Sequence, residues 1–199
     1  MIGLINYGSG NISAIANILD IANIPYTLVN KLEDFKDVNK LILPGVSSFD
    51  RTMELLEGKN FISVLHNLVV ERKVPIMGIC VGMQILFEGS DEGYKPGLGW
   101  IAGSVIKLSN ERTPHLGWNS IDNISHNITY DVDFKKGFYF LHSYKCMPSE
   151  ENVISVNSNY DEPICAIVIK DNIVGIQFHP EKSHSNGVKI FSNFHNYYQ

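Results

Sequence analysis

The fold of this chain is decided by the stretch Pro75-Ile76-Met77-Gly78-Ile79-Cys80-Val81-Gly82-Met83-Gln84. Its apolar run predicts a buried strand that ends at Cys80, and a helix-compatible run follows over 83–87. Glycines stand two residues before and two residues after the cysteine, as in a tight strand-to-helix turn whose neighbours have little room for side chains. Such an elbow places the sulfur at the first turn of a helix, where free N–H groups favour the reactive thiolate. The alternative is a structural cysteine buried in an ordinary strand.

Composition and charge narrow the class of protein. The chain has 199 residues, of which 44% are hydrophobic and 19% charged, which predicts one globular domain over residues 1–199. Sixteen basic residues against 21 acidic residues give a net charge of −5 without any basic block, so we expect no nucleic-acid partner. The sequence has no run of about 18 apolar residues and no basic leader, so we expect no membrane span or signal peptide and a cytoplasmic location.

The cysteines exclude two further classes. Cys80, Cys146 and Cys165 are far apart in the sequence and form no C-x-x-C pair. We therefore expect neither a disulfide framework nor a thiolate metal site, and no cofactor.

The order of apolar runs predicts an α/β fold. The expected strands of the first half lie at 2–6, 26–29, 40–43 and 75–79, and the expected helices at 12–22 and 61–69. Continuous apolar strands in β-α-β order predict a parallel sheet covered on both faces. After a glycine-rich loop, 88–100, the expected strands are shorter and lie at 104–108, 138–141, 153–156, 165–169 and 173–178. A hairpin turn at Asp171-Asn172 and a closing helix over 188–198 complete a single three-layer αβα domain, with antiparallel strands added to a mostly parallel sheet.

A second group of reactive residues, His179-Pro180-Glu181, follows the last predicted strand. Residues two apart in extended backbone project to the same side, and Pro180 biases His179 away from helix, so His179 and Glu181 can lie together. A carboxylate beside an imidazole fixes its tautomer and raises its basicity, which suits a base that activates a thiol. An ordinary surface pair and a metal site shared with Cys80 are the alternatives, but the glycine elbow and the adjacent carboxylate fit a Cys-His-Glu triad better.

A third candidate is the turn Pro44-Gly45-Val46-Ser47, which also follows a predicted strand. Its backbone N–H groups could point at a developing oxyanion. On its own the turn is a weak signal, because Pro-Gly simply marks turns.

Taken together, these motifs resemble those of class I, triad-type glutamine amidotransferases, with a flavodoxin-like fold. L-P-G-V at 43–46, G-I-C-V-G-M-Q at 78–84 and Q-F-H-P-E at 177–181 occur in the family's order, and the similarity spans nearly the whole chain. Within the class, N-Y-G-S-G-N at 6–11, P-H-L-G-W-N at 114–119, F-Y-F-L-H-S-Y at 138–144 and H-P-E-K-S at 179–183 resemble the glutaminase subunits of imidazole glycerol phosphate synthases. The resemblance implies a heterodimer in which ammonia from L-glutamine passes to a (β/α)8-barrel synthase (cyclase) partner. Imidazole glycerol phosphate and aminoimidazole carboxamide ribotide would be formed, in histidine biosynthesis.

The resemblance also implies roles for individual residues. Cys80 would form a thioester with the side chain of glutamine, His179 would move the protons, and Glu181 would orient His179. Backbone N–H groups would bind the oxyanion at Gly45, Val46, Ser47 and Val81. The amino-acid end of glutamine would be bound by Gln84, Glu92, His142, Ser143 and Tyr144. The edge facing the synthase would carry Asn11, Trp118, Asn119, Tyr139 and Lys182, with core packing as the alternative for the two aromatic residues.

One position departs from the family pattern. Ser47 stands where the family usually has a second glycine, which is thought to permit a peptide flip that completes the oxyanion hole when the partner is engaged. Serine disfavours positive φ by about 1 kcal/mol relative to glycine, so the flip is expected to be harder. Two other functions stay open: a paralogue that supplies ammonia for amidino-sugar formation in surface polysaccharides, and a non-catalytic regulatory subunit. The presence of Cys80, His179 and Glu181 disfavours the second.

Overall fold

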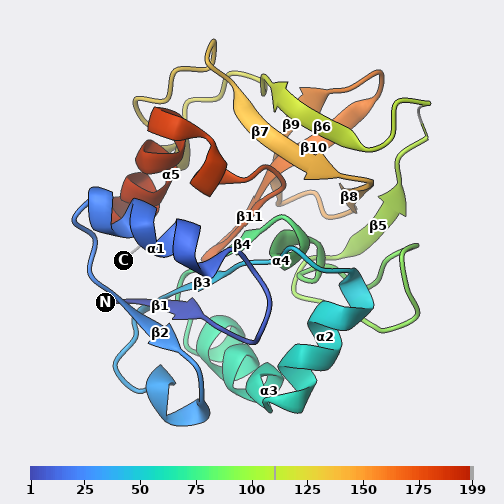
Figure 1. Ribbon diagram of the computed structural model, residues 1–199. Helices are drawn as coiled ribbons and strands as arrows, with labels where there is room; N and C mark the ends of the chain where they lie inside the picture. The colour runs from blue at the N-terminus through green and yellow to red at the C-terminus, as the bar shows by residue number, and fades with distance from the viewer. Residues whose placement is uncertain (110, 198–199) are drawn as a thin grey trace.

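The chain folds around one central sheet, seen in a computed structural model that describes residues 1–109 and 111–197 (Figure 1). The seven-stranded sheet has the order β2-β1-β3-β4-β11-β10-β9. Its strands are β1 (Ile2–Ile5), β2 (Tyr26–Val29), β3 (Lys40–Leu43), β4 (Ile76–Ile79), β9 (Ile154–Asn159), β10 (Pro163–Lys170) and β11 (Ile173–Ile176). The first four strands and β11 are parallel, whereas β10 and β9 are antiparallel to their neighbours. The predicted fold class is therefore confirmed.

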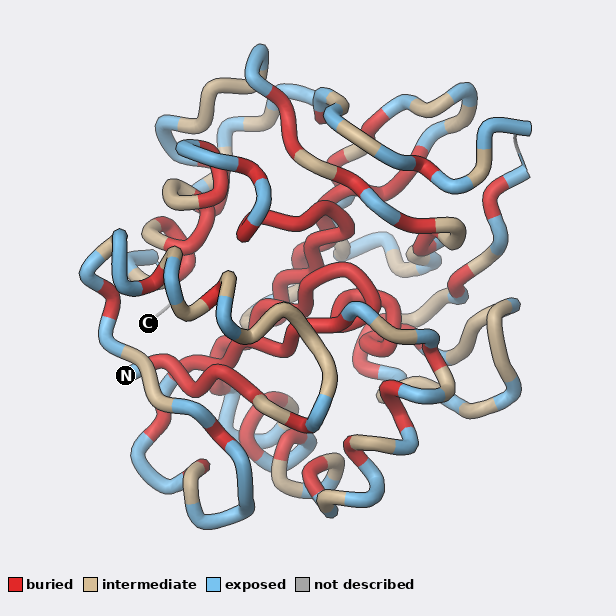
Figure 2. The backbone as a smooth tube through the Cα atoms, in the orientation of Figure 1, coloured by how far each residue is buried: buried red, intermediate tan, exposed pale blue. Residues whose placement is uncertain are grey.

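Helices cover both faces of this sheet. Helices α1 (Ile12–Ile21) and α5 (His184–Tyr197) lie on one face, and α2 (Phe49–Gly58) and α3 (Phe61–His66) on the other (Figure 1). Every residue of β1, β3, β4 and β11 is buried, which explains why these strands are apolar apart from Lys40 at the start of β3 (Figure 2). Each helix buries one apolar stripe, for example Ile15 and Leu19 of α1, four residues apart. The strands and helices therefore form one buried αβα core.

Two small antiparallel sheets extend the domain beyond the carboxyl ends of β4 and β11 (Figure 1). They pair β5 (Gly103–Lys107) with β8 (Tyr144–Pro148), and β6 (His115–Asn119) with β7 (Phe138–His142). Short 3-10 turns lie at Leu32–Phe35, Asn127–Thr129 and Pro180–Lys182, and a π turn at Asn67–Glu71 extends α3. Within the part of the chain that the structure describes, no helix is both long and apolar enough to cross a membrane.

Some expected elements differ from those observed. Helix α2 and strands β6 and β8 were not predicted, and the strands expected at 104–108 and 138–141 pair outside the main sheet. Short strands that bury only alternate residues carry little periodic signal, and their sequence does not specify a pairing partner. Helix α5 begins at His184, earlier than expected, and the expected end at Tyr198 lies outside the described residues. The helix after Cys80, α4 (Val81–Gln84), has only four residues, so it contributes less helix dipole than the sequence suggested.

Candidate active site

Cys80 occupies a strained turn between β4 and α4. Its φ of 55° and ψ of −113° lie outside the regions that non-glycine residues ordinarily adopt. The flanking glycines are required by close backbone contacts: a Cβ at Gly78 would lie 2.4 Å from the carbonyl oxygen of Gly82, and a Cβ at Gly82 would lie 2.0 Å from the carbonyl oxygen of Leu43. The chain therefore forms the predicted elbow, and strained backbone of this kind gathers at functional sites.

His179 reaches the same place from the neighbouring strand. The parallel register pairs Ile176 with Ile79, so the segments that follow β11 and β4 leave the sheet side by side. The backbone N–H of His179 donates to the carbonyl oxygen of Tyr139 at 2.8 Å, and the Ser183 hydroxyl donates to the carbonyl oxygen of His179 at 2.7 Å. The backbone of His179 is thus held by β7 on one side and by the following turn on the other.

Glu181 pairs with His179 away from solvent. The two side chains are 1% and 4% exposed, and Glu181 Oε1 lies 2.9 Å from His179 Nδ1. Burial disfavours the imidazolium, but hydrogen bonds with Cys80 and Glu181 outweigh it and raise the pKa of His179 to about 10. The arrangement can therefore hold a positive charge beside the sulfur, which suits a base that has taken the thiol proton.

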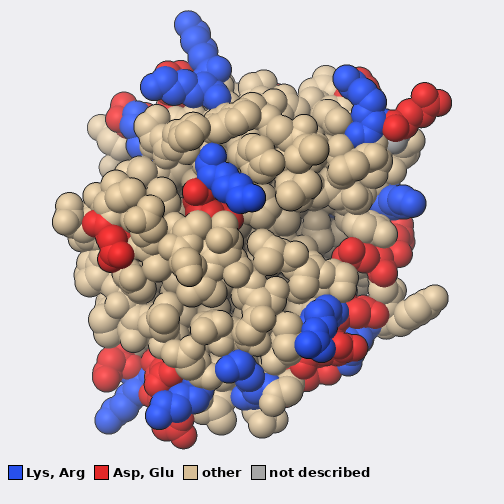
Figure 3. Space-filling view, viewed as in Figure 1, with Lys and Arg blue, Asp and Glu red and all other residues tan. Residues whose placement is uncertain are grey.

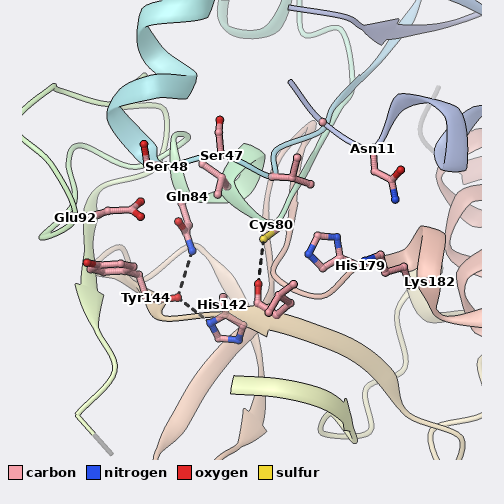
Figure 4. A pocket seen from close by; sticks show the side chains of 14 residues that line it. Asn11, Ser47, Ser48, Cys80, Gln84, Glu92, His142, Tyr144, His179 and Lys182 are labelled. Atoms are coloured by element: carbon pink, nitrogen blue, oxygen red, sulfur yellow. Dashed lines mark hydrogen bonds between the residues drawn. The ribbon is translucent and has the colours of Figure 1, made fainter. Parts of the chain in front are cut away.

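A cavity of about 590 Å³ opens in front of the cysteine (Figure 4). Its walls bring together residues from both halves of the chain, namely Gly10, Asn11, Val46, Ser47, Ser48, Cys80, Val81, Gln84, Glu92, Leu141, His142, Tyr144, His179 and Lys182. Two of the predicted glutamine- and oxyanion-binding residues, Gly45 and Ser143, are not among the described residues that line it. Gly45 instead packs behind the wall, where a Cβ would lie 2.4 Å from the backbone nitrogen of Gly82.

Glu92 and Gln84 present acceptor oxygens to this cavity (Figure 4). The backbone N–H of Phe49, at the start of α2, donates to Glu92 Oε2 at 2.8 Å, so the carboxylate is held in place. The Gln84 Nε2 group donates inward, to the carbonyl oxygen of Tyr144 and to Gln177 Oε1, both at 3.2 Å. The carbonyl end of the Gln84 amide is therefore left for a ligand, and the pair suits a ligand ammonium group.

His142 contributes to the cavity wall as a neutral imidazole. Burial lowers its pKa to about 3, and burial likewise lowers the pKa of the neighbouring His115 to about 4. His142 Nδ1 lies 2.9 Å from the carbonyl oxygen of Tyr144, so this nitrogen carries the proton, and the other ring nitrogen accepts from His115 at 3.0 Å. His115 is itself buried between the rings of Phe140 and Tyr160.

The Pro44 turn lies beside the elbow and is tied down by side chains. Tyr7 donates its hydroxyl to the carbonyl oxygen of Pro44 at 2.6 Å. The Ser9 hydroxyl donates to Ser47 Oγ at 3.2 Å, and Ser47 Oγ also lies 3.0 Å from the hydroxyl of Thr52, which is buried. No residue of the 45–47 segment is among the positive-φ positions of the described chain. The segment therefore rests in an ordinary conformation held by two hydroxyl contacts.

Comparison with known proteins agrees with this geometry. The family model "Glutamine amidotransferase class-I" matches residues 4–196. The chain belongs to the class-I glutamine amidotransferase family. This amidotransferase is 42% identical over 201 residues to a Leptospira interrogans protein named imidazole glycerol phosphate synthase subunit HisH, with 98% of each chain covered. It is 38% identical over 198 residues to a Pseudomonas aeruginosa protein named imidazole glycerol phosphate synthase subunit HisH 2, again with 98% of each covered.

A solved structure supports the fold of the amidotransferase. One described as a crystal structure of glutamine amidotransferase superposes with a TM-score of 0.76, covering 97% of this chain and 96% of that one. The two sequences are only 17% identical, so this similarity bears on the fold alone.

Of the residues expected at a partner surface, Asn11 and Lys182 line the cavity. Trp118 is 48% exposed, so the core-packing alternative is wrong for this residue. Its ring lies edge-on to Tyr139, and the Lys182 ammonium lies 5.3 Å from the Tyr139 ring centre. Asn11 instead turns toward the buried carboxylate of the amidotransferase, and its Nδ2 donates to Glu181 Oε1 at 3.5 Å. Asn119 Nδ2 lies 3.1 Å from His115 Nε2 and donates to the carbonyl oxygen of Asn159 at 2.9 Å.

Sequence reasoning missed two groups that contact the Cys80 sulfur. The thiol donates to the carbonyl oxygen of Leu141 at 3.8 Å, and Gln177 Nε2 donates to the sulfur at the same distance. Every residue has a backbone carbonyl, so the sequence does not indicate that the one at Leu141 contacts the sulfur. Gln177 was part of the Q-F-H-P-E motif at 177–181, but the motif gave it no role of its own.

Proposed function

We propose that this amidotransferase is the glutaminase subunit of an imidazole glycerol phosphate synthase. The observation that carries the proposal is the cysteine held at positive φ in the same cavity as a buried histidine-carboxylate pair. The subunit names of relatives at about 40% identity and full-length coverage support the pathway, which is histidine biosynthesis. The free thiol that the reaction requires is typical of a cytoplasmic enzyme.

The chemistry follows from the geometry of the triad. His179 takes the proton of Cys80, and the thiolate attacks the side-chain carbonyl carbon of glutamine. His179 then gives a proton to the departing nitrogen, so ammonia leaves and a glutamyl thioester remains on Cys80. Water, activated by the neutral His179, attacks the thioester and releases glutamate with the thiol restored. Glu181 keeps Nδ1 protonated, so that the other ring nitrogen handles both proton transfers.

Binding groups for the substrate flank the triad. The N–H of Val81 precedes the intrahelical hydrogen bonds of α4 and can bind the oxyanion together with N–H groups of the 45–47 segment. Glu92 and the Gln84 carbonyl are placed for the α-ammonium group of glutamine, with His142 and Tyr144 shaping that end of the cavity. Ser143 is assigned through its backbone, whose carbonyl oxygen accepts from the N–H of Leu108 at 2.9 Å.

The partner we propose is a (β/α)8-barrel synthase that receives ammonia directly. Exposed apolar side chains lie on paired positions of β6 and β7, with Leu116 opposite Leu141 and Trp118 opposite Tyr139. On the face that carries β6 and β7, Figure 3 shows charged side chains mainly at the periphery, apart from adjacent basic and acidic groups near the centre. An apolar centre with a polar rim is typical of a protein interface. Transfer inside a complex also keeps ammonia from being protonated in water.

One experiment tests the proposal. The complex with its barrel synthase is supplied with glutamine and the ribulosyl formimino-carboxamide ribotide acceptor, and glutamate and both products are measured. In Cys80→Ala the glutamine-dependent reaction should disappear while free ammonium still supports product formation. Glutamine-dependent turnover that persists in Cys80→Ala would refute the triad assignment. Amidation of a nucleotide sugar instead of this acceptor would favour the paralogue that serves polysaccharide synthesis.

A further inference from the structure

Gln177 lies beside the nucleophile because of the strand register. It follows the last residue of β11, as Cys80 follows the last residue of β4, and these two strands pair Ile176 with Ile79. Its backbone N–H donates to the carbonyl oxygen of Ala166 at 2.9 Å, and its side chain is completely buried. The Nε2 atom lies 3.8 Å from Cys80 Sγ.

The orientation of the Gln177 amide follows from its neighbours. The carbonyl oxygen of Tyr144 can only accept, so the Gln84 atom that lies 3.2 Å from it must be the Nε2 donor. The same Nε2 lies 3.2 Å from the Gln177 side chain, whose nearer atom must then be the acceptor Oε1. The other end of the Gln177 amide is therefore the N–H donor, and it faces the sulfur. His142 is consistent with this orientation of the amides, because its protonated Nδ1 also donates to the carbonyl oxygen of Tyr144.

We propose that Gln177 is a further catalytic residue, whose fixed amide donates an N–H to the Cys80 sulfur and stabilises it as the thiolate. The donor bond is long while the sulfur is neutral and strengthens when the sulfur carries charge, as charge-assisted hydrogen bonds do. A buried amide whose other end is already paired has no competing acceptor among its described contacts.

The other ionisable groups near the sulfur are not altered by a change at Gln177. Those coupled to Cys80 are His179 with Glu181 behind it, Tyr7 after β1, and Cys146 on β8. The other ionisable groups on the wall of the same cavity are Glu92, His142, Tyr144 and Lys182. Burial raises the pKa of Tyr7 to about 12 and that of Cys146 well above its usual value, and it keeps His142 neutral. His179 is the ionisable group that is hydrogen-bonded to the thiol, and its contacts with Glu181 and Tyr139 do not involve Gln177.

The test measures the thiol itself. The rate of Cys80 alkylation by iodoacetamide is recorded against pH for the wild type, for Gln177→Met, which keeps the size without the donor, and for Gln177→Glu, which places a carboxylate there. Cys80→Ala corrects for reaction at the buried Cys146 and Cys165. We expect the midpoint to rise in Gln177→Met, with alkylation about fivefold to tenfold slower below it, and to rise further in Gln177→Glu. A Gln177→Met profile that superposes on the wild type, with an unchanged melting temperature, refutes the proposal.

A second measurement on the wild type guards against a variant that fails to fold. In protein labelled with ¹⁵N-glutamine, the Gln177 side-chain amide resonance should shift with the same midpoint as alkylation, and it should lose that shift in Cys80→Ala. An amide resonance that ignores the titration of Cys80 refutes the proposal.

The inference rests on the proposed function only in taking Cys80 as the nucleophile. Alkylation and the amide shift need no glutamine. A wild type that shows both effects but never hydrolyses glutamine with any partner would overturn the proposed function and leave the role of Gln177 standing.

Discussion

Ser47 is the position at which we predict the strongest control over resting activity. Its hydroxyl joins Ser9 to the buried Thr52 and so ties the oxyanion segment to both neighbouring elements. If the segment must flip a peptide to complete the oxyanion hole, Ser47 resists the flip in two ways, through these contacts and through its Cβ. Ser47→Gly removes both, and Ser47→Ala, the matched control, removes only the hydroxyl contacts.

The magnitudes follow from these two contributions. The Cβ disfavours positive φ by about 1 kcal/mol relative to glycine. The two hydroxyl contacts together contribute about 1 kcal/mol net, because water replaces them when the segment moves. Ser47→Ala should therefore raise the flipped population about fivefold, and Ser47→Gly, at about 2 kcal/mol, about thirtyfold.

The assay is glutamate release by the isolated subunit and by the complex with its synthase. We expect basal activity to rise about thirtyfold in Ser47→Gly and about fivefold in Ser47→Ala. In the complex with acceptor bound, both variants should stay within about twofold of the wild type, since the partner already favours the flipped state. Melting curves check that both variants fold.

Two outcomes would refute this reasoning. Unchanged basal activity in Ser47→Gly would show that no barrier at position 47 limits the resting enzyme. Equal stimulation by glycine and alanine would assign the whole effect to the hydroxyl contacts and remove the backbone contribution.

Three further predictions concern the fold, the base and the interface. Gly82→Ala should destabilise the protein by about 3 kcal/mol and lower the melting temperature by at least about 6 °C, because its Cβ would lie 2.0 Å from the carbonyl oxygen of Leu43; an unchanged melting temperature would contradict the close approach. Because the folded pKa of His179 is raised to about 10, its charged form should stabilise the protein fully below about pH 6.5 and progressively less toward pH 10. The difference in unfolding free energy between wild type and His179→Gln, from urea titrations, should shrink over that range rather than stay constant. Trp118→Ala should weaken binding of the barrel synthase at least about tenfold by calorimetry, without a change in melting temperature; unchanged affinity would place the interface elsewhere.

Much of the fold could be predicted because the main strands are buried on both faces. Strands β1, β3, β4 and β11 are apolar except for Lys40 at the start of β3, and such runs are the strongest signal that a parallel sheet leaves in a sequence. The small sheets were harder, since β6 buries His115 but exposes Leu116 and Trp118, the reverse of the usual alternation. The exposed apolar residues there belong to a surface that we assign to a partner. The hydrophobic pattern of such a strand reflects burial against the partner as well as burial within the chain, so it does not show the usual alternation.

The sequence alone determined the elbow through Gly78 and Gly82. Only glycine fits at these two positions, because a Cβ there would lie within 2.4 Å of a backbone carbonyl oxygen. The sequence also brought His179 and Glu181 together as a pair, although the two side chains meet across the 3-10 turn at Pro180–Lys182 and not along the extended backbone that the sequence suggested. Only the tertiary structure decided how the cysteine is surrounded. Strand register set Gln177 beside Cys80, and the carbonyl of Tyr144, through Gln84, turned the Gln177 amide toward the sulfur. Register and hydrogen-bond direction depend on contacts between residues far apart in the chain, and no local pattern records them.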